Sequence, residues 1–107
     1  MSSEPSPTMY ADLFEQRPLR WGLRGDPHLW QELQAHFASS PLPEKASELQ
    51  QQLGAAFHLL TGASLSTQGS VRVERFPTLG MSGGLVSVDF WRETAVPFLL
   101  SRFQNRA

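Results

Sequence analysis

The chain has 107 residues, close to the commonest size of a single domain, and its net charge is −1 at pH 7. It contains no cysteine, which excludes disulfides, thiolate metal sites and cysteine nucleophiles. The nearly neutral balance lacks the long-range attraction to phosphate backbones that most nucleic-acid binders use. We therefore expect no nucleic-acid partner.

Two features of the sequence bear on where the protein resides. No stretch approaches the ~20 apolar residues of a membrane span. Residues 1–8 lack the basic end and apolar run of a signal peptide, and their serine and proline content predicts a disordered tail. We expect a soluble, cytoplasmic protein of bacterial type with no membrane partner, in which residues 9–107 form one α+β domain.

Two short elements are expected at the start of this domain. A helix over 9–16 is predicted by apolar residues at helical spacing, which are Met9, Tyr10, Leu13 and Phe14, and Pro18 ends it. The next residues, 19–23, alternate between apolar and basic side chains. They are either a short strand or an extended loop.

The strongest local signal lies where the next helix begins. Gly25 permits a turn, Asp26 is a favoured N-cap, and Pro27 suits the first helical position. An apolar face follows at helical spacing and predicts a helix over 27–38, with Leu29, Trp30, Leu33 and Phe37 on its buried side.

A second long helix is expected between Pro43, which suits a first helical turn, and Gly62, a natural helix stop. Glu44 places a negative charge at the positive end of the helix dipole. The apolar stripe of this helix consists of Ala46, Leu49, Leu53, Ala56, Phe57 and Leu60. Because the connection is short, the two helices should pack as an antiparallel pair.

The composition then changes to that of a β-hairpin and a last helix. Val71 and Val73 alternate with charged residues, which predicts a strand that Pro77 ends, and the apolar run 85–88 predicts a second strand. Residues 79–84 should form a flexible glycine-rich loop between them. Ser87 or Asp89 is expected to cap the last helix, in which Pro97 predicts a kink or a restart.

The element order predicts a small two-layer α+β domain, in which an antiparallel helix pair is followed by a β-hairpin and a C-terminal helix. The same order is found in winged-helix domains, where the third helix reads DNA and the hairpin is the wing. A winged-helix-like fold is therefore the alternative, on element order alone.

A ligand-binding or anion-binding site is one hypothesis that the sequence raises. Arg20, Trp21 and Arg24 precede a helix N-terminus, where free N–H groups and arginines bind anions. Ser82 and Gly83 belong to a stretch, 80–84, that spells the G-x-S-x-G pattern of a nucleophile elbow. No histidine follows the serine and a strand is expected after it, so we predict no catalytic residue. The loop is expected to be a flexible turn, and binding of an anion by Ser82 and Gly83 is its functional alternative.

Two further patterns lie on the predicted helices. His28, Glu32 and His36 fall on one side of the first long helix, where two imidazoles and a carboxylate could bind a metal ion. The zinc motif His-Glu-x-x-His is absent, so a solvated Glu–His row is the favoured explanation and we predict no metal and no cofactor. The second helix carries the glutamines Gln50, Gln51 and Gln52, which are able to pair with adenine but lack arginines to hold phosphates.

The last helix carries more apolar surface than one buried face needs. Phe90, Trp91, Phe98 and Leu99 point to more than one side of it, and a homodimer interface would cover them. We therefore expect a protein partner or a second copy of the chain.

The function that the sequence favours is a non-enzymatic protein-interaction or regulatory domain, which needs no special residues. A winged-helix DNA-binding regulator is the first alternative. The second is a small anion-binding or ligand-binding protein, or an enzyme, that uses Arg20, Arg24 and the loop 80–84.

Overall fold

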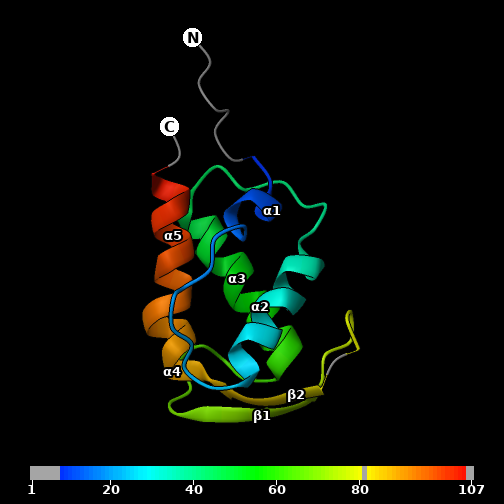
Figure 1. Cartoon of the computed structure of the whole chain (residues 1–107). Helices are drawn as coiled ribbons and strands as arrows, with labels where there is room; N and C mark the ends of the chain where they lie inside the picture. Colours follow the sequence, from blue (N-terminus) through cyan, green and yellow to red (C-terminus); the bar gives the residue numbers. More distant parts are fainter. Residues whose placement is uncertain (1–7, 81, 106–107) are drawn as a thin grey trace.

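The computed structural model describes residues 8–80 and 82–105. Its elements in chain order are α1 (Tyr10–Leu13), α2 (Gly25–His36), α3 (Ala46–Thr61), β1 (Ser70–Arg75), β2 (Ser82–Ser87), α4 (Val88–Phe90), the π-helical segment η1 (Trp91–Ala95) and α5 (Val96–Gln104) (Figure 1). These elements confirm the predicted α+β class and its order of helix pair, hairpin and C-terminal helix.

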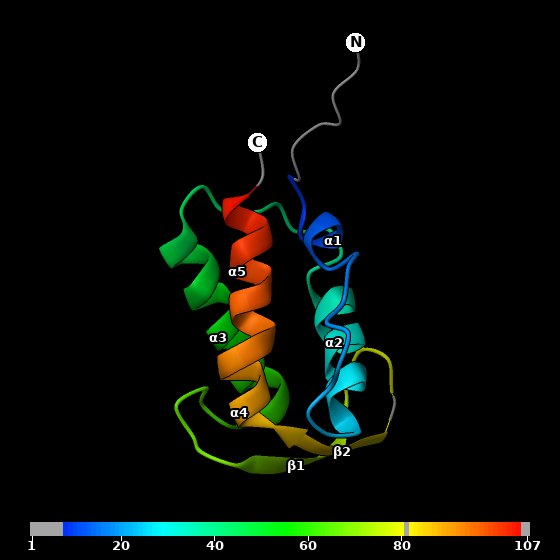
Figure 2. The ribbon, with the colours of Figure 1, turned by 60° about the vertical axis from the view of Figure 1, so that its left-hand side comes forward.

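The helices α2, α3 and α5 run along the length of the molecule, and the hairpin crosses one end of them (Figures 1 and 2). Helix α2 begins at the hairpin end whereas α3 ends there, so the two run in opposite directions, as the short connection predicted. Helix α5 starts at the hairpin end and packs against α3.

The structured part of the chain begins at Thr8. Its carbonyl accepts a hydrogen bond of 2.7 Å from the Leu42 N–H, and Met9 forms an isolated antiparallel bridge with Pro41. Thr8, which we assigned to the tail, is thus part of the domain, while the rest of the predicted tail, 1–7, lies outside the described residues. Helix α1 is shorter than the predicted 9–16.

Helix α3 follows its end signal closely. It stops before Gly62, whose φ of 76° lies in the left-handed region that favours glycine, and the Gly62 N–H donates to the His58 carbonyl over 2.8 Å. Its predicted apolar stripe is confirmed, because Leu49, Leu53, Ala56, Phe57 and Leu60 are all buried. The helix begins at Ala46, later than Pro43 suggested.

The hairpin is antiparallel, with Val71 opposite Val86 and Arg75 opposite Ser82. Val73 and Val86 are buried against the helices. Strand β2 begins at Ser82, earlier than the predicted 85, so the prediction that Ser82 and Gly83 belong to a flexible loop is wrong. Cross-strand pairing, which local composition does not reveal, extends the strand through these small residues.

The C-terminal helix is continuous from α4 to α5. The Ser87 hydroxyl accepts from the Phe90 N–H over 3.1 Å, which confirms Ser87 as the N-cap. The α-helical pattern restarts at Val96, with Pro97 in the first turn of α5, so the predicted kink or restart takes the form of a restart without a break in the helical backbone. Because proline has no N–H to donate to the residue four positions earlier, the preceding turn widens into the π-helical η1.

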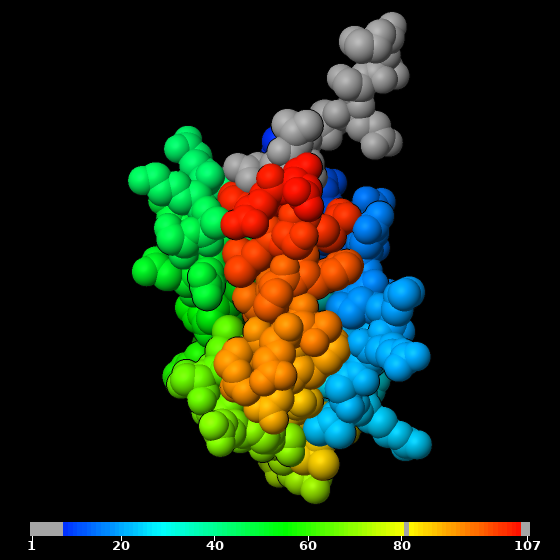
Figure 3. All heavy atoms as spheres, turned by 90° about the vertical axis from the view of Figure 1, so that its left-hand side faces the viewer, coloured from blue at the N-terminus to red at the C-terminus, as the bar shows by residue number. Residues whose placement is uncertain are grey.

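The apolar surplus of the last helix is largely used inside the chain. Trp91 and Leu99 are 1% and 0% exposed, so they cannot present a surface to a second copy. Of the predicted interface residues, only Phe90 and Phe98 are half-buried and accessible. Figure 3 shows why, because the segment before α2 covers one flank of this helix and α3 covers the other.

Candidate functional site

The segment between α1 and α2 carries the candidate site. Residues 19–23 form no strand, so the loop alternative is correct. Trp21 fixes this loop to the domain, because its ring centroid lies 5.7 Å from that of Trp30 and 5.7 Å from that of Phe90. Leu19 is fully exposed, at 100%. The segment is therefore an irregular surface loop with a single aromatic attachment point.

A buried carboxylate anchors the C-terminal end of this loop. Asp26 is 0% exposed, and its Oδ2 accepts from the Leu23 N–H over 2.6 Å. Its Oδ1 accepts from the Ser87 N–H over 3.0 Å and from the Trp91 indole N–H over 2.8 Å. The carboxylate thus ties the loop to the end of β2 and to η1.

The prediction that Asp26 is the N-cap of α2 is wrong. Arg24 already has helical dihedrals, with φ −62° and ψ −29°, so the helix starts before Asp26. The bond from the Leu23 N–H places Asp26 inside the first turn, in the position of the acidic residue of a capping box. The other carboxylate oxygen, Oδ1, accepts from Ser87 and Trp91, which lie outside the helix and take no part in capping.

Burial raises the pKa of Asp26 above its ordinary value of 3.8, because the charged form loses its hydration. The N–H donors of Leu23, Trp91 and Ser87 oppose this by stabilising the carboxylate, but they do not cancel the effect of burial. A carboxylate that accepts from the N–H groups of three separate segments acts as a structural anchor.

The start of α2 lies directly on β2. A Cβ atom at Gly25 would lie 2.4 Å from the Leu85 carbonyl oxygen and 2.7 Å from that of Gly83, so only glycine permits this approach. The His28 ring nitrogen Nδ1 lies 3.1 Å from the Ser82 carbonyl oxygen. Helix α2 and the anchored loop therefore share one support, which is the outer edge of β2.

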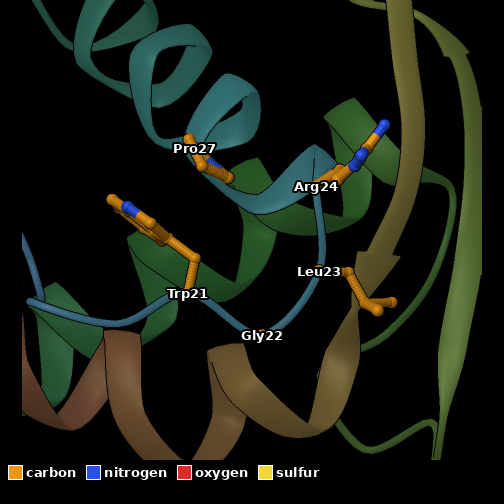
Figure 4. A pocket seen from close by; sticks show the side chains of 5 residues that line it. All are labelled: Trp21, Gly22, Leu23, Arg24 and Pro27. Atoms are coloured by element: carbon orange, nitrogen blue, oxygen red, sulfur yellow. The ribbon is translucent and has the colours of Figure 1, made fainter.

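A pocket of about 400 Å³ opens at the anchored loop, lined by Trp21, Gly22, Leu23, Arg24 and Pro27. Trp21 and Pro27 extend toward each other across it, whereas Leu23 and Arg24 point the other way, toward β2 (Figure 4). The pocket thus presents one aromatic ring and one proline ring, with the stem of an exposed arginine at its margin.

The structure gathers only part of the predicted binding site. Trp21 and Arg24 line the pocket, while Arg20 is exposed and does not line it. Ser82 is exposed at the start of β2, but Gly83 is buried, and a Cβ there would meet the Val73 carbonyl oxygen at 2.2 Å. Gly83 is needed for strand pairing, which leaves no room for an anion at its side-chain position.

The row His28, Glu32 and His36 is divided by a second buried carboxylate. Glu32 is 0% exposed, and its Oε2 and Oε1 accept from the N–H groups of Thr78 and Leu79 over 2.7 and 3.0 Å. His28 and His36 are exposed. Among residues 8–80 and 82–105, no group of three acidic or histidine side chains is arranged to hold a metal. Glu32 instead holds the hairpin loop against α2.

The glutamine face of α3 is partly used inside the protein. Gln50, Gln51 and Gln52 are all exposed, and the Oε1 of Gln52 also accepts a hydrogen bond from the Tyr10 hydroxyl. One glutamine of this face thus holds α1 against α3, the helix that would read DNA in a winged-helix domain.

Asp26 was predicted only as an N-cap and Glu32 only as part of a solvated row, yet both carboxylates are buried. A signal for Asp26 was present, because it lies three and four residues before Leu29 and Trp30 and so falls on the apolar face of α2. Glu32 lies three residues after Leu29, at the margin of the same face. An acidic residue at such a position is buried only if N–H donors reach it.

The chain matches no family model, no curated protein and no solved structure. None of the helices within residues 8–80 and 82–105 has the length and apolar character to cross a membrane.

Proposed function

We propose that this protein is a non-enzymatic protein-interaction domain that binds its partner at the Trp21 pocket. The observation that carries the proposal is that a half-buried tryptophan stands on an irregular loop whose end is held by a buried carboxylate. Loops held by a rigid scaffold are where binding residues concentrate.

The anchoring reduces the entropy lost when a partner binds. The loop is fixed by the stacking of Trp21 and by the Leu23–Asp26 hydrogen bond, so its side chains are ordered before contact. Ordering a mobile loop costs about 0.5–1.5 kcal/mol for each immobilised side chain. A prearranged loop avoids that cost, which favours recognition at this place over the rest of the surface.

The composition of the pocket indicates what kind of partner fits. Tryptophan and arginine dominate the residues that contribute most to protein interfaces, and Trp21 and Arg24 are both present here. The Arg24 side chain is exposed, so it is free to meet a carboxylate. We expect a partner segment that places an apolar side chain between Trp21 and Pro27 and an acidic residue on the β2 side of the pocket, toward which Arg24 points (Figure 4).

A phage-displayed library of random short peptides, selected on the full chain, tests the proposal. We expect enriched peptides with apolar and acidic residues, whose affinity falls at least about tenfold in Trp21→Ala, or about 1.4 kcal/mol. Arg24→Glu, an exposed position, should weaken acidic peptides similarly without affecting folding. Leu19→Ala is the matched control, because Leu19 is on the same loop but does not line the pocket.

The unfolding temperature of each variant separates lost binding from lost folding. If no enriched peptide depends on Trp21 while the variants remain folded, the pocket is not an interaction site. If acidic peptides bind the Arg24→Glu variant as tightly as the original protein, the expectation that an acidic residue of the partner meets Arg24 is wrong.

A further inference from the structure

The two edges of the hairpin differ. The outer edge of β2 is covered, because Gly25 lies against the carbonyls of Gly83 and Leu85 and Asp26 accepts the Ser87 N–H. The sheet has two strands, so β1 forms its other edge. Covering an edge in this way prevents pairing with another chain, whereas no backbone hydrogen bond from elsewhere in residues 8–80 and 82–105 reaches the outward edge of β1.

The direction of the β1 backbone groups follows from one hydrogen bond. The Val88 N–H donates to the Gly69 carbonyl over 2.9 Å, so residues at alternate positions from Gly69 face β2. The intervening residues, Ser70, Arg72 and Glu74, direct their N–H and C=O groups outward. All three are exposed, and within the described part of the chain no backbone group from outside the hairpin is hydrogen bonded to them.

We propose that a second copy of the chain pairs with this edge, β1 against β1, in the antiparallel direction. Val73 would lie opposite the partner's Val73, and Arg72 would lie opposite Glu74 of the partner subunit. The two-fold axis repeats that ion pair on the other side. This pairing joins two hairpins into one four-stranded antiparallel sheet with the order β2-β1-β1-β2.

The register of the proposed β1–β1 pair follows from two conditions, which are that residues with outward-directed backbone groups lie opposite each other and that opposite charges meet. Arg72 and Glu74 both direct backbone groups outward, so they are able to form a hydrogen-bonded pair across the axis. A register centred on Arg72 would set two arginines directly opposite each other, and one centred on Glu74 would set two glutamates opposite each other. Like charges in that arrangement are destabilising. The register centred on Val73 converts both contacts into opposite-charge pairs.

The position of β1 leaves space for the second copy. In both ribbon views β1 is the outermost strand at the end of the molecule opposite the C-terminal end of α5, and β2 lies between it and α2 (Figures 1 and 2). A strand added to β1 therefore extends the sheet away from α2. Because the contact is a single strand pair, the dimer should be of the weak, small-interface kind.

Charge reversal gives a specific test by analytical ultracentrifugation, at concentrations up to about 1 mM because small interfaces are weak. The unaltered chain should reach a mass near twice 12.0 kDa. Arg72→Glu alone sets two glutamates against each other, and Glu74→Arg alone sets two arginines against each other. Each should raise the dimer Kd roughly tenfold to a hundredfold.

Mixing the two single variants is the decisive step. The Arg72→Glu chain has negative side chains at positions 72 and 74, and the Glu74→Arg chain has positive side chains at both. Every contact in the mixed dimer therefore joins opposite charges, and dimerisation should return. The double variant Arg72→Glu/Glu74→Arg should also dimerise. Arg17→Glu, the same charge change at an exposed residue away from β1, is the control and should leave the Kd unchanged.

Three outcomes would overturn the proposal. These are a chain that stays monomeric at every concentration, single variants that dimerise like the original, and a mixture that does not recover. If the chain stays monomeric and its β1 amide hydrogens are protected from exchange only when a strand of another protein is added, the edge binds a different partner and the dimer proposal is wrong. None of these results depends on Trp21, so this proposal and the pocket proposal fail independently.

Discussion

The indole N–H of Trp91 donates to the Asp26 carboxylate over 2.8 Å, and the bond joins residues 65 positions apart. Both side chains are buried, at 1% and 0% exposure. A buried carboxylate is tolerated only when donors replace its lost water. Asp26 therefore connects the Trp21 loop, the end of β2 and the C-terminal helix through one group.

Removing this carboxylate should destabilise the whole domain. In Asp26→Ala the N–H groups of Leu23, Ser87 and Trp91 lose their acceptor, and each buried unpaired donor costs about 1–3 kcal/mol. We expect a loss of at least about 2 kcal/mol in the free energy of unfolding by urea. Trp91→Phe, which removes one donor and keeps most of the ring, should cost less. Equal losses in the two variants would contradict the anchoring role.

The contribution of Asp26 should depend on pH in a defined direction. Burial raises the pKa of Asp26 above 3.8, so the folded protein holds this proton more tightly than the unfolded chain does. The part of the stability that is linked to this ionisation is fully present below pH 3.8 and is lost as the pH rises through the folded pKa. The urea stability of the original chain minus that of Asp26→Ala should therefore decrease from pH 3.8 upward. An increase would contradict the raised pKa.

The approach of α2 to β2 should make Gly25 intolerant of any side chain. A Cβ would lie 2.4 Å from the Leu85 carbonyl oxygen, and a backbone atom has little freedom to move. We expect Gly25→Ala to lower the urea stability by about 2 kcal/mol or more, as overpacking does. Gly54→Ala is the control, since its Cβ would meet only Leu65 Cδ1 at 3.8 Å. That change inside α3 should stabilise by roughly 0.5–1 kcal/mol.

Local rules predicted much of this fold. Gly62 ends α3, Ser87 caps the last helix, and Val73 marks a strand, because each signal acts over a few residues. At Pro97 the sequence predicted a kink or a restart, but not the π-helical turn that precedes it. The missing N–H accounts for an interruption at this place, and a local rule does not specify its form.

The site was less predictable because its contacts are distant in sequence. Asp26 meets partners 61 and 65 positions away, and Glu32 meets partners 46 and 47 positions away. Local patterns show that these carboxylates lie near an apolar face, but not which N–H groups reach them. Gly83 was assigned to a loop for the same reason, since its burial arises from pairing and from the arrival of α2.

Tyr10 offers a direct spectroscopic check on the packing of α1. It is the sole tyrosine of the chain and is 0% exposed, and burial raises its pKa from 10.0 to about 12. The tyrosinate absorbance of the folded protein should therefore rise with a midpoint near pH 12, whereas the protein unfolded in urea should titrate near pH 10. Because the folded state holds the proton more tightly, stability from this group is present below pH 10 and is lost as the pH rises toward 12. A folded midpoint near 10 would show that Tyr10 is accessible to water and that α1 is not docked as described.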